Sequence, residues 1–465
     1  MKSKYFLQKL IMLTLATFAL GCTDTFLEAK PSTDIVMPSS LADLEVLLDN
    51  TNVIIKTPAL GHMSSDELEF LSYTQWNAAG TATERNCYIW AKDIYEGEQE
   101  RPDWNTPYKA VFYANNVLAI LEKLDPISDP QRYNQLKGWA HFIRGYAFFV
   151  LAEHFAPAYD QLSAESDYGI PLRLSPNVDE IVQRSSVKQT YAQILDDVQL
   201  SSQLLTSQFQ VSRRNRPSNV AAFALLSRVY LAMSNFDKAE DNADKVLNSY
   251  DKLLDYNQIS QTSTQPFTNV NDEVLYSCQQ VSGVYYTTVV GNSAVTIKVS
   301  PDLIALYSTN DLRLRMLYAQ RGVGNYYPKR GYYGGDSFMF TGLAVNEIYL
   351  VKAECLARKG NFAQSMQLLN QLLVKRFSNQ QPFVPLSASN PQEALANVLV
   401  ERRKELAWRG LRWGDIRRLN KLGAGISLSR TLNGVTYVLK PNERKYVFPI
   451  PMDEITRSGI NQNER

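Results

Sequence analysis

Histidine is scarce in this sequence, and its acidic and basic residues almost cancel. Three histidines, His62, His141 and His154, occur in 465 residues, and no two have the spacing of a metal-ligand pair such as H-x-x-x-H. This scarcity argues against a zinc enzyme or a histidine-dependent triad. Together with the patterns below, it leads us to predict a protein with no catalytic residue, no metal and no cofactor. Lys and Arg total 48 against 47 Asp and Glu, which gives a net charge of +1. A chain with so little net charge has no overall positive potential to attract phosphate groups, so we do not expect nucleic acid as a partner.

Cysteine is also rare, and the four cysteines form no C-x-x-C motif. Cys22 follows an apolar run near the start of the chain and is the predicted lipidation site described below. The other three cysteines, Cys87, Cys278 and Cys355, are an odd number. No disulfide framework can be read from this spacing. One bridge is possible in an oxidising compartment, but buried free thiols are the favoured interpretation.

The apolar run from Leu10 to Leu20 is too short to span a bilayer and has the length of a secretory signal. Three lysines precede it, and Ala19-Leu20-Gly21-Cys22 follows the pattern of a bacterial lipobox. We therefore predict a lipoprotein signal peptide over residues 1–21, lipidation of Cys22, and a polar tether over residues 22–40. The alternative is a cleaved signal without lipidation.

Helical patterns dominate the rest of the chain, residues 41–465, which we expect to form a single domain. From Trp104 to Leu118, apolar residues recur at spacings of three and four. The stretch from Trp139 to Phe155 is apolar on almost every side, which places it between other helices. A membrane span is the competing interpretation, but Arg144, Glu153 and two histidines interrupt the run.

Two segments repeat the pattern of a tetratricopeptide hairpin, a pair of helices joined by a short turn. Ala221 to Leu247 has its turn at Ser234-Asn235-Phe236, and Glu347 to Leu373 aligns with it without a gap, with Gly360-Asn361-Phe362 at the turn. In such units an aromatic residue at the turn fills the gap between helices. Residues 108–155 and 186–205 are expected to form two degenerate hairpins, so that the hairpins span about 104–155, 186–250 and 344–376.

Between the aligned hairpins, residues of about 255–343 are rich in glycine, β-branched and aromatic residues, which predicts loops and short strands. A solenoid carries its insertions on one face, and that face often binds ligands. Near the end of the chain, Asn390-Pro391 begins a helix that runs to about Trp408. The basic and acidic residues from Glu401 to Arg418 predict ion pairs between helices in a packed corner.

Several of these motifs resemble the SusD/RagB-like lipoproteins of Bacteroidetes. They are the lipobox, the Arg144-Gly145-Tyr146 helix, the hairpin at 348–362, the segments Glu401-Arg-Arg-Lys-Glu-Leu and Arg409-Gly-Leu-Arg-Trp-Gly-Asp, and the terminal Phe448-Pro-Ile-Pro within a signature region of about 390–465. The resemblance implies a mainly α, tetratricopeptide-like scaffold with loop-rich insertions. It also implies a non-catalytic lipoprotein on the outer face of the outer membrane that delivers a nutrient, usually a glycan, to a SusC-like TonB-dependent channel.

Capture of a glycan without hydrolysis needs aromatic faces for sugar rings and amides for hydroxyl groups, held on preformed loops. Two aromatic-rich segments meet this need, although the loops of this family diverge too far for a residue-by-residue assignment. Trp90 and Tyr88 could instead pack beneath the loops, and Trp104 is expected in the core. The candidate ligand-binding residues are Tyr73, Trp76, Asn77, Trp90, Tyr285, Tyr286, Tyr326, Tyr327, Tyr332 and Tyr333.

Other functions remain as alternatives. A peptide-binding member of the family would also use tyrosine and asparagine, and a protein-interaction scaffold would need no small ligand. Gly335-Asp336-Ser337 does not have the setting of a hydrolase nucleophile, because no histidine follows it. The acidic cluster Asp66, Glu67 and Glu69 could bind calcium or act as glycosidase carboxylates, but a solvated helix start is the simpler interpretation.

Overall fold

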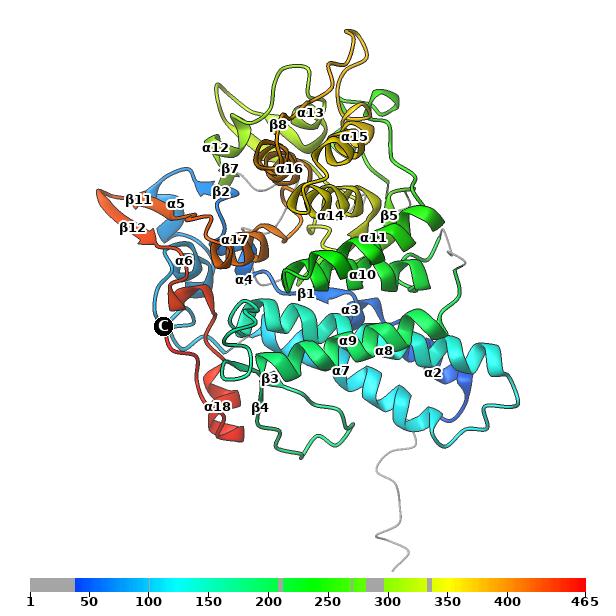
Figure 1. The fold of residues 1–465 in the computed structure, drawn as a ribbon. Coiled ribbons are helices and arrows are strands. Elements are labelled where there is room, and N and C mark those ends of the chain that lie inside the picture. Colours follow the sequence, from blue (N-terminus) through cyan, green and yellow to red (C-terminus); the bar gives the residue numbers. More distant parts are fainter. Residues whose placement is uncertain (1–37, 100, 208–211, 269–270, 282–296, 333–336) are drawn as a thin grey trace, which may run out of the picture. The chain divides into compact units, whose positions relative to one another are not determined.

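The computed structural model describes residues 38–465 except 100, 208–211, 269–270, 282–296 and 333–336. Leu41–Arg465 form one compact unit (Figure 1). Its longer helices are α2 (Leu41–Leu48), α7 (Pro102–Leu121), α8 (Pro130–Phe155), α9 (Val187–Leu204), α10 (Asn219–Ala232), α11 (Phe236–Ser249), α14 (Val345–Arg358), α15 (Phe362–Leu373), α16 (Pro391–Glu405) and α17 (Arg412–Lys421). Its shorter helices are α3 (Thr51–Ile54), α4 (Leu60–Ser64), α5 (Tyr73–Asn77), α6 (Ala82–Tyr88), α12 (Pro301–Ile304), α13 (Arg313–Leu317) and α18 (Met452–Ser458), with 3-10 turns η2 (Tyr256–Gln258) and η4 (Arg444–Tyr446).

The strands are short and pair two by two. β1 (Lys56–Thr57) runs parallel to β6 (Gln279–Gln280), and the other pairs are antiparallel. These are β2 (Leu68–Phe70) with β7 (Ile297–Val299), β3 (Tyr168–Pro171) with β4 (Arg184–Ser186), β5 (Val274–Tyr276) with β10 (Leu343–Ala344), β8 (Tyr318–Gln320) with β9 (Tyr326–Pro328), and β11 (Leu428–Leu432) with β12 (Val435–Leu439). The described part of the 255–343 insertion contains the predicted loops and short strands, and in addition the short helices α12 and α13 and the turn η2.

The helices stack in chain order. α7 packs on α8, α8 on α9, α9 on α10, α10 on α11, α11 on α14, and α14 on α15 and α16 (Figure 1). One continuous core of buried apolar residues runs through this stack. Each hairpin buries its apolar face against its neighbours, as in a helical-repeat protein. The predicted mainly α, tetratricopeptide-like fold is confirmed.

Helix α8 lies inside the stack, as its apolar sequence predicts. Asp129 caps its start by accepting the Arg132 backbone N–H at 3.1 Å, and almost every residue from Leu136 to Phe155 is buried. Its buried Arg144 donates to Asp197 of α9 at 2.7 and 2.9 Å and to Asn115 of α7 at 3.0 Å. One guanidinium thus joins three helices. No described helix has the length and hydropathy to cross a bilayer.

The segment 186–205 differs from the prediction, because it forms the single helix α9 and not a hairpin. Ser186 and Gln189 make a reciprocal capping box at its start. No glycine or proline occurs between Val187 and Leu204 to end the helix there. The helix continues until its apolar face is fully packed on α8 and α10.

The two aligned hairpins share a left-handed residue at the turn. Ser234 has φ of 57° between α10 and α11, and Gly360 has φ of 87° between α14 and α15. Glycine adopts this conformation at little cost, whereas a residue with a Cβ atom is strained there. The same turn therefore stores strain in the first hairpin and not in the second.

We predict opposite effects of exchanging these residue types. Ser234→Gly should raise the free energy of unfolding by about 0.5–1 kcal/mol, and Gly360→Ala should lower it by about 1 kcal/mol. A Cβ atom at Gly360 would meet nothing within 4 Å, so its cost is conformational and not steric. Urea unfolding of both variants measures these changes, and changes of the same sign in both would contradict the shared geometry.

The turn aromatics are less buried than predicted. Phe236 and Phe362 are of intermediate exposure and pack at the edge of the main core. The Arg358 guanidinium of the following hairpin lies 4.7 Å from the centre of the Phe236 ring and covers part of it, while it also pairs with Glu354. Removal of either ring should therefore cost less than the about 3–5 kcal/mol of a fully buried phenylalanine.

The three cysteines of the described region are buried free thiols, as favoured from the sequence. Burial raises the pKa of Cys278 to about 12, so this thiol is neutral at physiological pH. Cys22 and most of the predicted tether lie outside the described residues.

Candidate functional site

A second, smaller core underlies the surface where the first aromatic-rich segment lies. Its buried residues come from β2, α6, β7, α12 and the loop after it, β8, β11, the loop before β10 and the segment just after α16. Trp76, Tyr326 and Tyr437 pack at its edge. α5 and β2 adjoin each other in the chain and in space, and β7 pairs with β2 (Figure 1). We call the surface formed by α5, the β8–β9 hairpin and the β11–β12 hairpin the α5 face.

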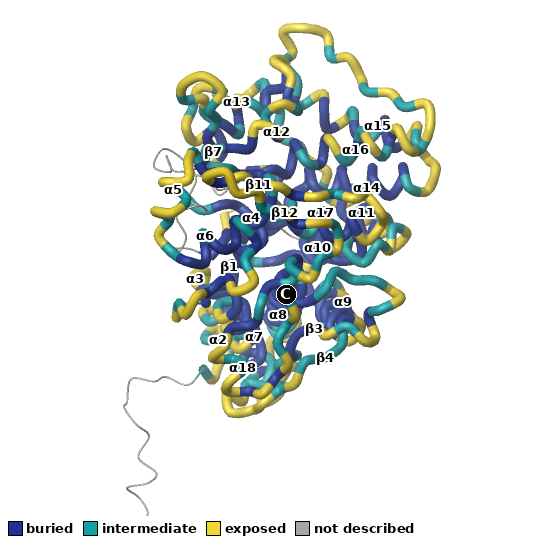
Figure 2. The backbone as a smooth tube through the Cα atoms, turned by 90° about the vertical axis from the view of Figure 1, so that its left-hand side faces the viewer, coloured by how far each residue is buried: buried dark blue, intermediate teal, exposed yellow. Residues whose placement is uncertain are grey.

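Helix α5 presents the predicted aromatic platform. Ser72 caps this short helix by accepting the Gln75 backbone N–H at 3.2 Å. None of its residues is fully buried, in contrast to α4 and most of α6 (Figure 2). Tyr73 is 43% exposed, Asn77 is exposed and Trp76 is half-buried. The structure therefore places three of the predicted binding residues at solvent on one rigid turn.

The platform is held in a fixed orientation. The Trp76 indole N–H donates to the Arg85 carbonyl at 3.1 Å, and Arg85 in turn donates to the Ala79 carbonyl at 2.7 Å. The rings of Tyr73 and Trp76 lie with centroids 5.4 Å apart at 38°. A ring pair fixed in this way can stack on a ligand with little loss of side-chain entropy.

The β8–β9 hairpin contributes the second predicted segment. Its turn at residues 321–325 contains Gly322 and Gly324 with φ of 75° and 73°, and Val323 at the tip is 98% exposed. Tyr326 is half-buried, and its hydroxyl donates to Gln320 Oε1 across the hairpin at 3.4 Å. Tyr326 and Trp76 border the same small core.

Trp90 is a core residue, so its assignment to the binding site is wrong. It is 1% exposed, and its indole N–H donates to the Ser64 carbonyl at 3.0 Å. The Arg430 guanidinium lies 3.8 Å from the centre of the Tyr88 ring and 4.8 Å from that of Trp90. Both rings pack beneath the loops against an arginine of β11, which is the alternative that the sequence left open.

Tyr327 and Tyr332 are also buried, at 5% and 6% exposure, and are not available to a ligand. Tyr332 donates to the Glu273 carboxylate, and its hydroxyl lies 3.1 Å from that of Tyr256. These buried polar partners hold it in the interior. Tyr285, Tyr286, Tyr333, Gly335 and Asp336 lie outside the described residues.

The sequence analysis missed the β11–β12 hairpin beside this face. Asn433 and Gly434, both with positive φ, form its two-residue turn, which is a strong hairpin signal between alternating residues. Tyr437 of β12 packs at the edge of the second core, and Val435 and Val438 are 53% and 44% exposed. The Asn-Gly pair between Leu432 and Val435 could have revealed this element.

The acidic cluster at residues 66–69 is not a solvated helix start, because two of its members are held by residues of the 408–412 segment. Asp66 accepts from Arg412 Nε at 2.7 Å, and Glu67 is buried and accepts the Trp408 backbone N–H at 2.9 Å. Although burial would raise the pKa of Asp66, hydrogen bonds from Arg412 hold it below its ordinary value. Across the described ranges, no three His, Cys, Asp or Glu side chains come together as a metal site.

Most charged residues of the Glu401–Arg418 segment are buried, and several form the predicted ion pairs. Arg402 and Arg418 both donate to Asp415 at 2.8 Å. Glu405 accepts from Arg376 Nε at 2.8 Å and from Arg313 Nη1 at 3.2 Å. These residues form the packed corner between α14, α16, α17 and the insertion.

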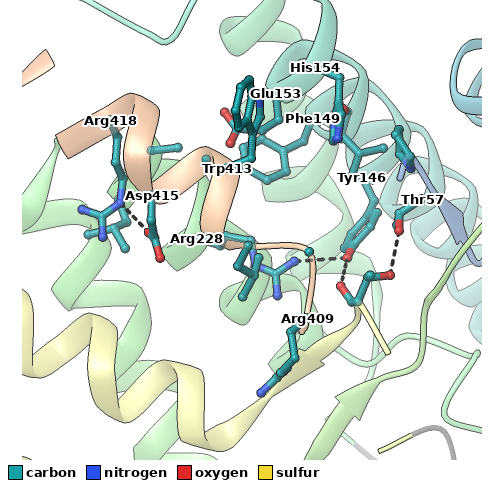
Figure 3. A pocket seen from close by; sticks show the side chains of 18 of the residues that line it. Thr57, Tyr146, Phe149, Glu153, His154, Arg228, Arg409, Trp413, Asp415 and Arg418 are labelled. Carbon is teal, nitrogen blue, oxygen red and sulfur yellow. Dashed lines mark hydrogen bonds and ion pairs between the residues drawn. The ribbon is translucent and has the colours of Figure 1, made fainter. Parts of the chain in front are cut away.

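A cavity of about 70 Å³ lies beside this corner (Figure 3). Tyr146 donates to the Thr341 carbonyl at 2.9 Å and accepts from Arg228 at 3.1 Å, and Thr57 and Thr341 hydroxyls lie 2.7 Å apart. Its volume is well below the about 300–1,000 Å³ of small-molecule sites. This cavity is a polar packing junction between α8, α10 and α17.

The three histidines are engaged in interior contacts. His62 Nδ1 lies 3.3 Å from Glu67, His141 Nδ1 lies 2.7 Å from Asp197, and His154 Nδ1 lies 2.7 Å from the Val150 carbonyl. Burial lowers the pKa of His154 to about 4. None of the three lies on the α5 face.

Comparisons with known proteins agree with this fold. A family model described as "Starch-binding associating with outer membrane" matches residues 25–231, and one described as "SusD family" matches residues 316–464. SusD-like protein P2 of Formosa agariphila is 23% identical over 518 residues, with 97% of each chain covered.

Solved structures share the fold over nearly the whole chain. A putative sugar binding protein from Bacteroides vulgatus has a TM-score of 0.73 at 22% identity, covering 92% of this chain and 99% of that one. A SusD superfamily protein from Bacteroides thetaiotaomicron has a TM-score of 0.74 at 22% identity, covering 92% and 100%. A laminarin binding SusD-like protein has a TM-score of 0.64 at 19% identity, covering 91% and 98%. With two family models matching different parts of the chain and one relative matching along its length, the chain belongs to the SusD family.

Proposed function

We propose that this protein binds a carbohydrate at the α5 face and does not alter it chemically. The observation that carries the proposal is the fixed Tyr73–Trp76 pair at solvent, with the exposed Asn77 beside it. Sugar rings present C–H faces that stack on aromatic rings, and their hydroxyls pair with amides. The sugar-binding and laminarin-binding proteins of similar fold support this ligand class.

The role that follows is nutrient capture at the cell surface. The lipobox at residues 19–22 supports lipidation of Cys22, and the matching family is described as associating with the outer membrane. We propose that the protein is anchored there, faces the exterior and delivers its ligand to a SusC-like TonB-dependent channel. A peptide nutrient is the second candidate, favoured by the tyrosines and the exposed amide of the same face.

Replacement of the platform tests the proposal. Trp76→Ala should weaken binding to a retained polysaccharide by about tenfold to a hundredfold, because a stacked aromatic anchor contributes about 1–3 kcal/mol. Affinity electrophoresis in gels containing laminarin or starch measures this loss, and a peptide array tests the second candidate.

Trp104→Ala is the matched control, because Trp104 is 2% exposed and lies in the main core. This variant should lose about 3–5 kcal/mol of stability, while its folded fraction keeps the wild-type affinity. Unchanged affinity after Trp76→Ala would place the site elsewhere, and any product released from the polysaccharide would establish an enzyme.

A further inference from the structure

A groove of about 590 Å³ is lined by residues none of which belongs to the elements of the α5 face. Its walls are residues 157–158 and 166–168 after α8, the end of α17, and residues from the segments 442–447 and 461–464. Figure 2 shows the C-terminus in front of α8 and close to β3, and α6 lies between it and α5 in both views (Figures 1 and 2). The volume is within the range of small-molecule sites. We propose that this groove is a second carbohydrate-binding site, which takes an uncharged sugar on the ring of Tyr168.

Tyr168 has the properties of a stacking platform. Its side chain lines the groove and the residue is 51% exposed, whereas an arginine covers one face of the ring: the Arg184 guanidinium lies 5.1 Å from its centroid. Arg184 is itself fixed, because it donates to the Gly169 carbonyl at 2.8 Å and to the Asn461 carbonyl at 3.0 Å. Asn461 Nδ2 donates to the Tyr168 hydroxyl at 2.9 Å. The ring is therefore held from behind and at its end, and its exposed part faces the groove.

The groove walls are held by amide side chains. Asn463 Nδ2 donates to the Phe155 carbonyl at 2.9 Å and to the Phe448 carbonyl at 2.8 Å, which joins the end of the chain to α8. Asn420 exchanges hydrogen bonds with the backbone of Ile426 at 2.7 and 2.9 Å. Walls held in this way need little reorganisation when a ligand enters, and this lowers the cost of binding.

The charge of the groove indicates a neutral ligand. Arg417, Lys421 and Arg444 line it together with Asp167, Glu443 and Glu464, so three basic residues face three acidic ones. Lys421 and Arg444 are also paired with carboxylates, Asp160 and Glu464. A site of zero net charge has no preference for an anion or a cation. Polar walls around a supported tyrosine ring fit an uncharged sugar.

The second site is proposed to bind the same class of ligand as the α5 face, so it rests on the proposed function. It uses none of the residues of the α5 face. Two sites on one chain would hold a polysaccharide by two points, which raises the apparent affinity without any new contact. A short oligosaccharide would instead occupy the two sites separately.

Three variants separate the sites: Tyr168→Ala, Trp76→Ala and the double variant, with Tyr168→Phe as the control that keeps the ring. We expect Tyr168→Ala to weaken retention in laminarin or starch gels about tenfold and Tyr168→Phe to retain wild-type binding. Alginate, which is anionic, should show no retention that depends on Tyr168. Thermal unfolding checks that each variant is folded.

Titration calorimetry with a trisaccharide of the retained polymer gives the stoichiometry. We expect two molecules per wild-type chain and one per chain for each single alanine variant. One molecule per wild-type chain, lost only in Trp76→Ala, would overturn the second site and leave the proposed function intact. Two molecules with Tyr168→Ala unchanged would also overturn it. Absence of retention of the wild type in all the neutral gels would overturn both proposals.

Discussion

Glu405→Ala should lower the free energy of unfolding by about 3–5 kcal/mol, because it removes the carboxylate that two fully buried arginines share and breaks both ion pairs. Arg313 is then left with Asp311 and Glu401, and Arg376 with Glu273. Glu405 accepts from Arg376 at 2.8 Å, from Arg313 at 3.2 Å and from Asn346 at 2.8 Å. Both arginines have no exposed surface. Although burial would raise the pKa of Glu405, Arg376 and Arg313 hold it below its ordinary value, so the carboxylate is charged in the folded protein.

Glu45 provides the matched control. It also pairs with two arginines, Arg132 and Arg216, but its side chain is 26% exposed. Water screens such a pair, so Glu45→Ala should cost at most about 1 kcal/mol. Urea unfolding of both variants compares them, with Glu405→Gln as a variant that keeps the shape and one acceptor. Similar losses in Glu45→Ala and Glu405→Ala would show that burial does not decide the energetics of these pairs.

The helical part of the fold was predictable because its signals are local. The helix pairs α10–α11 and α14–α15 are predicted by Ala, Leu and Ser at helical spacing and by the Asn-Phe turns at 235–236 and 361–362. The failures in this part were failures of extent. The segment 186–205 contains no turn residue, so it forms one helix that ends at Leu204, and Phe236 is covered in part by Arg358 of the next hairpin.

The binding face was predictable only in part, because burial of an aromatic residue depends on distant segments. Trp76 and Trp90 lie in the same aromatic-rich stretch, Trp76 between polar neighbours and Trp90 between apolar ones, and the sequence left the burial of Trp90 open. Arg430 of β11 covers the rings of Trp90 and Tyr88. Arg430 and Tyr88 are 342 positions apart in the sequence, so this contact could not be read from local pattern. Tyr332 is likewise buried, and its hydroxyl donates a hydrogen bond to the buried Glu273 carboxylate. Composition identifies the aromatic segments, whereas tertiary partners decide which rings meet solvent.

Acidification should destabilise the protein from about pH 6.5, before its carboxylates are protonated. His154 is buried beside Phe448 and Trp413, its ring centroid lies 5.9 Å from that of Phe448, and it bonds the Val150 carbonyl. Burial and the nearby Arg417 charge lower its pKa from 6.5 to about 4, against the effect of the Val150 hydrogen bond. The folded protein therefore holds this imidazole neutral over a range in which the unfolded chain protonates it.

The sign of the effect follows from proton binding. Below pH 6.5 His154 binds a proton in the unfolded state, whereas in the folded state it binds one only near pH 4. The contribution of this residue to the free energy of unfolding is therefore complete above pH 6.5 and is lost as the pH falls. A shift from 6.5 to about 4 corresponds to about 3 kcal/mol in all, of which about 2 kcal/mol is lost by pH 5. Urea unfolding at pH 7.5 and at pH 5 measures this loss.

His154→Gln isolates the contribution, because glutamine can donate to the Val150 carbonyl but does not titrate. The variant should lose about 2 kcal/mol less than the wild type between pH 7.5 and pH 5. Added salt should leave this difference in place, since desolvation and not a screened charge is its main cause. Equal losses in both proteins would show that the imidazole is protonated in the folded state.

The carboxylates act at lower pH, which keeps the two effects apart. Although burial would raise it, the charges of Arg402 and Arg418 lower the pKa of Asp415 from 3.8 to about 2. Its contribution is therefore present above about pH 4 and is lost between about pH 4 and pH 2, in the order of 2 kcal/mol. Because this range lies below that of His154, the wild type should lose stability in two stages and His154→Gln only in the lower one. A single loss confined to pH below 4 in the wild type would contradict the role of His154.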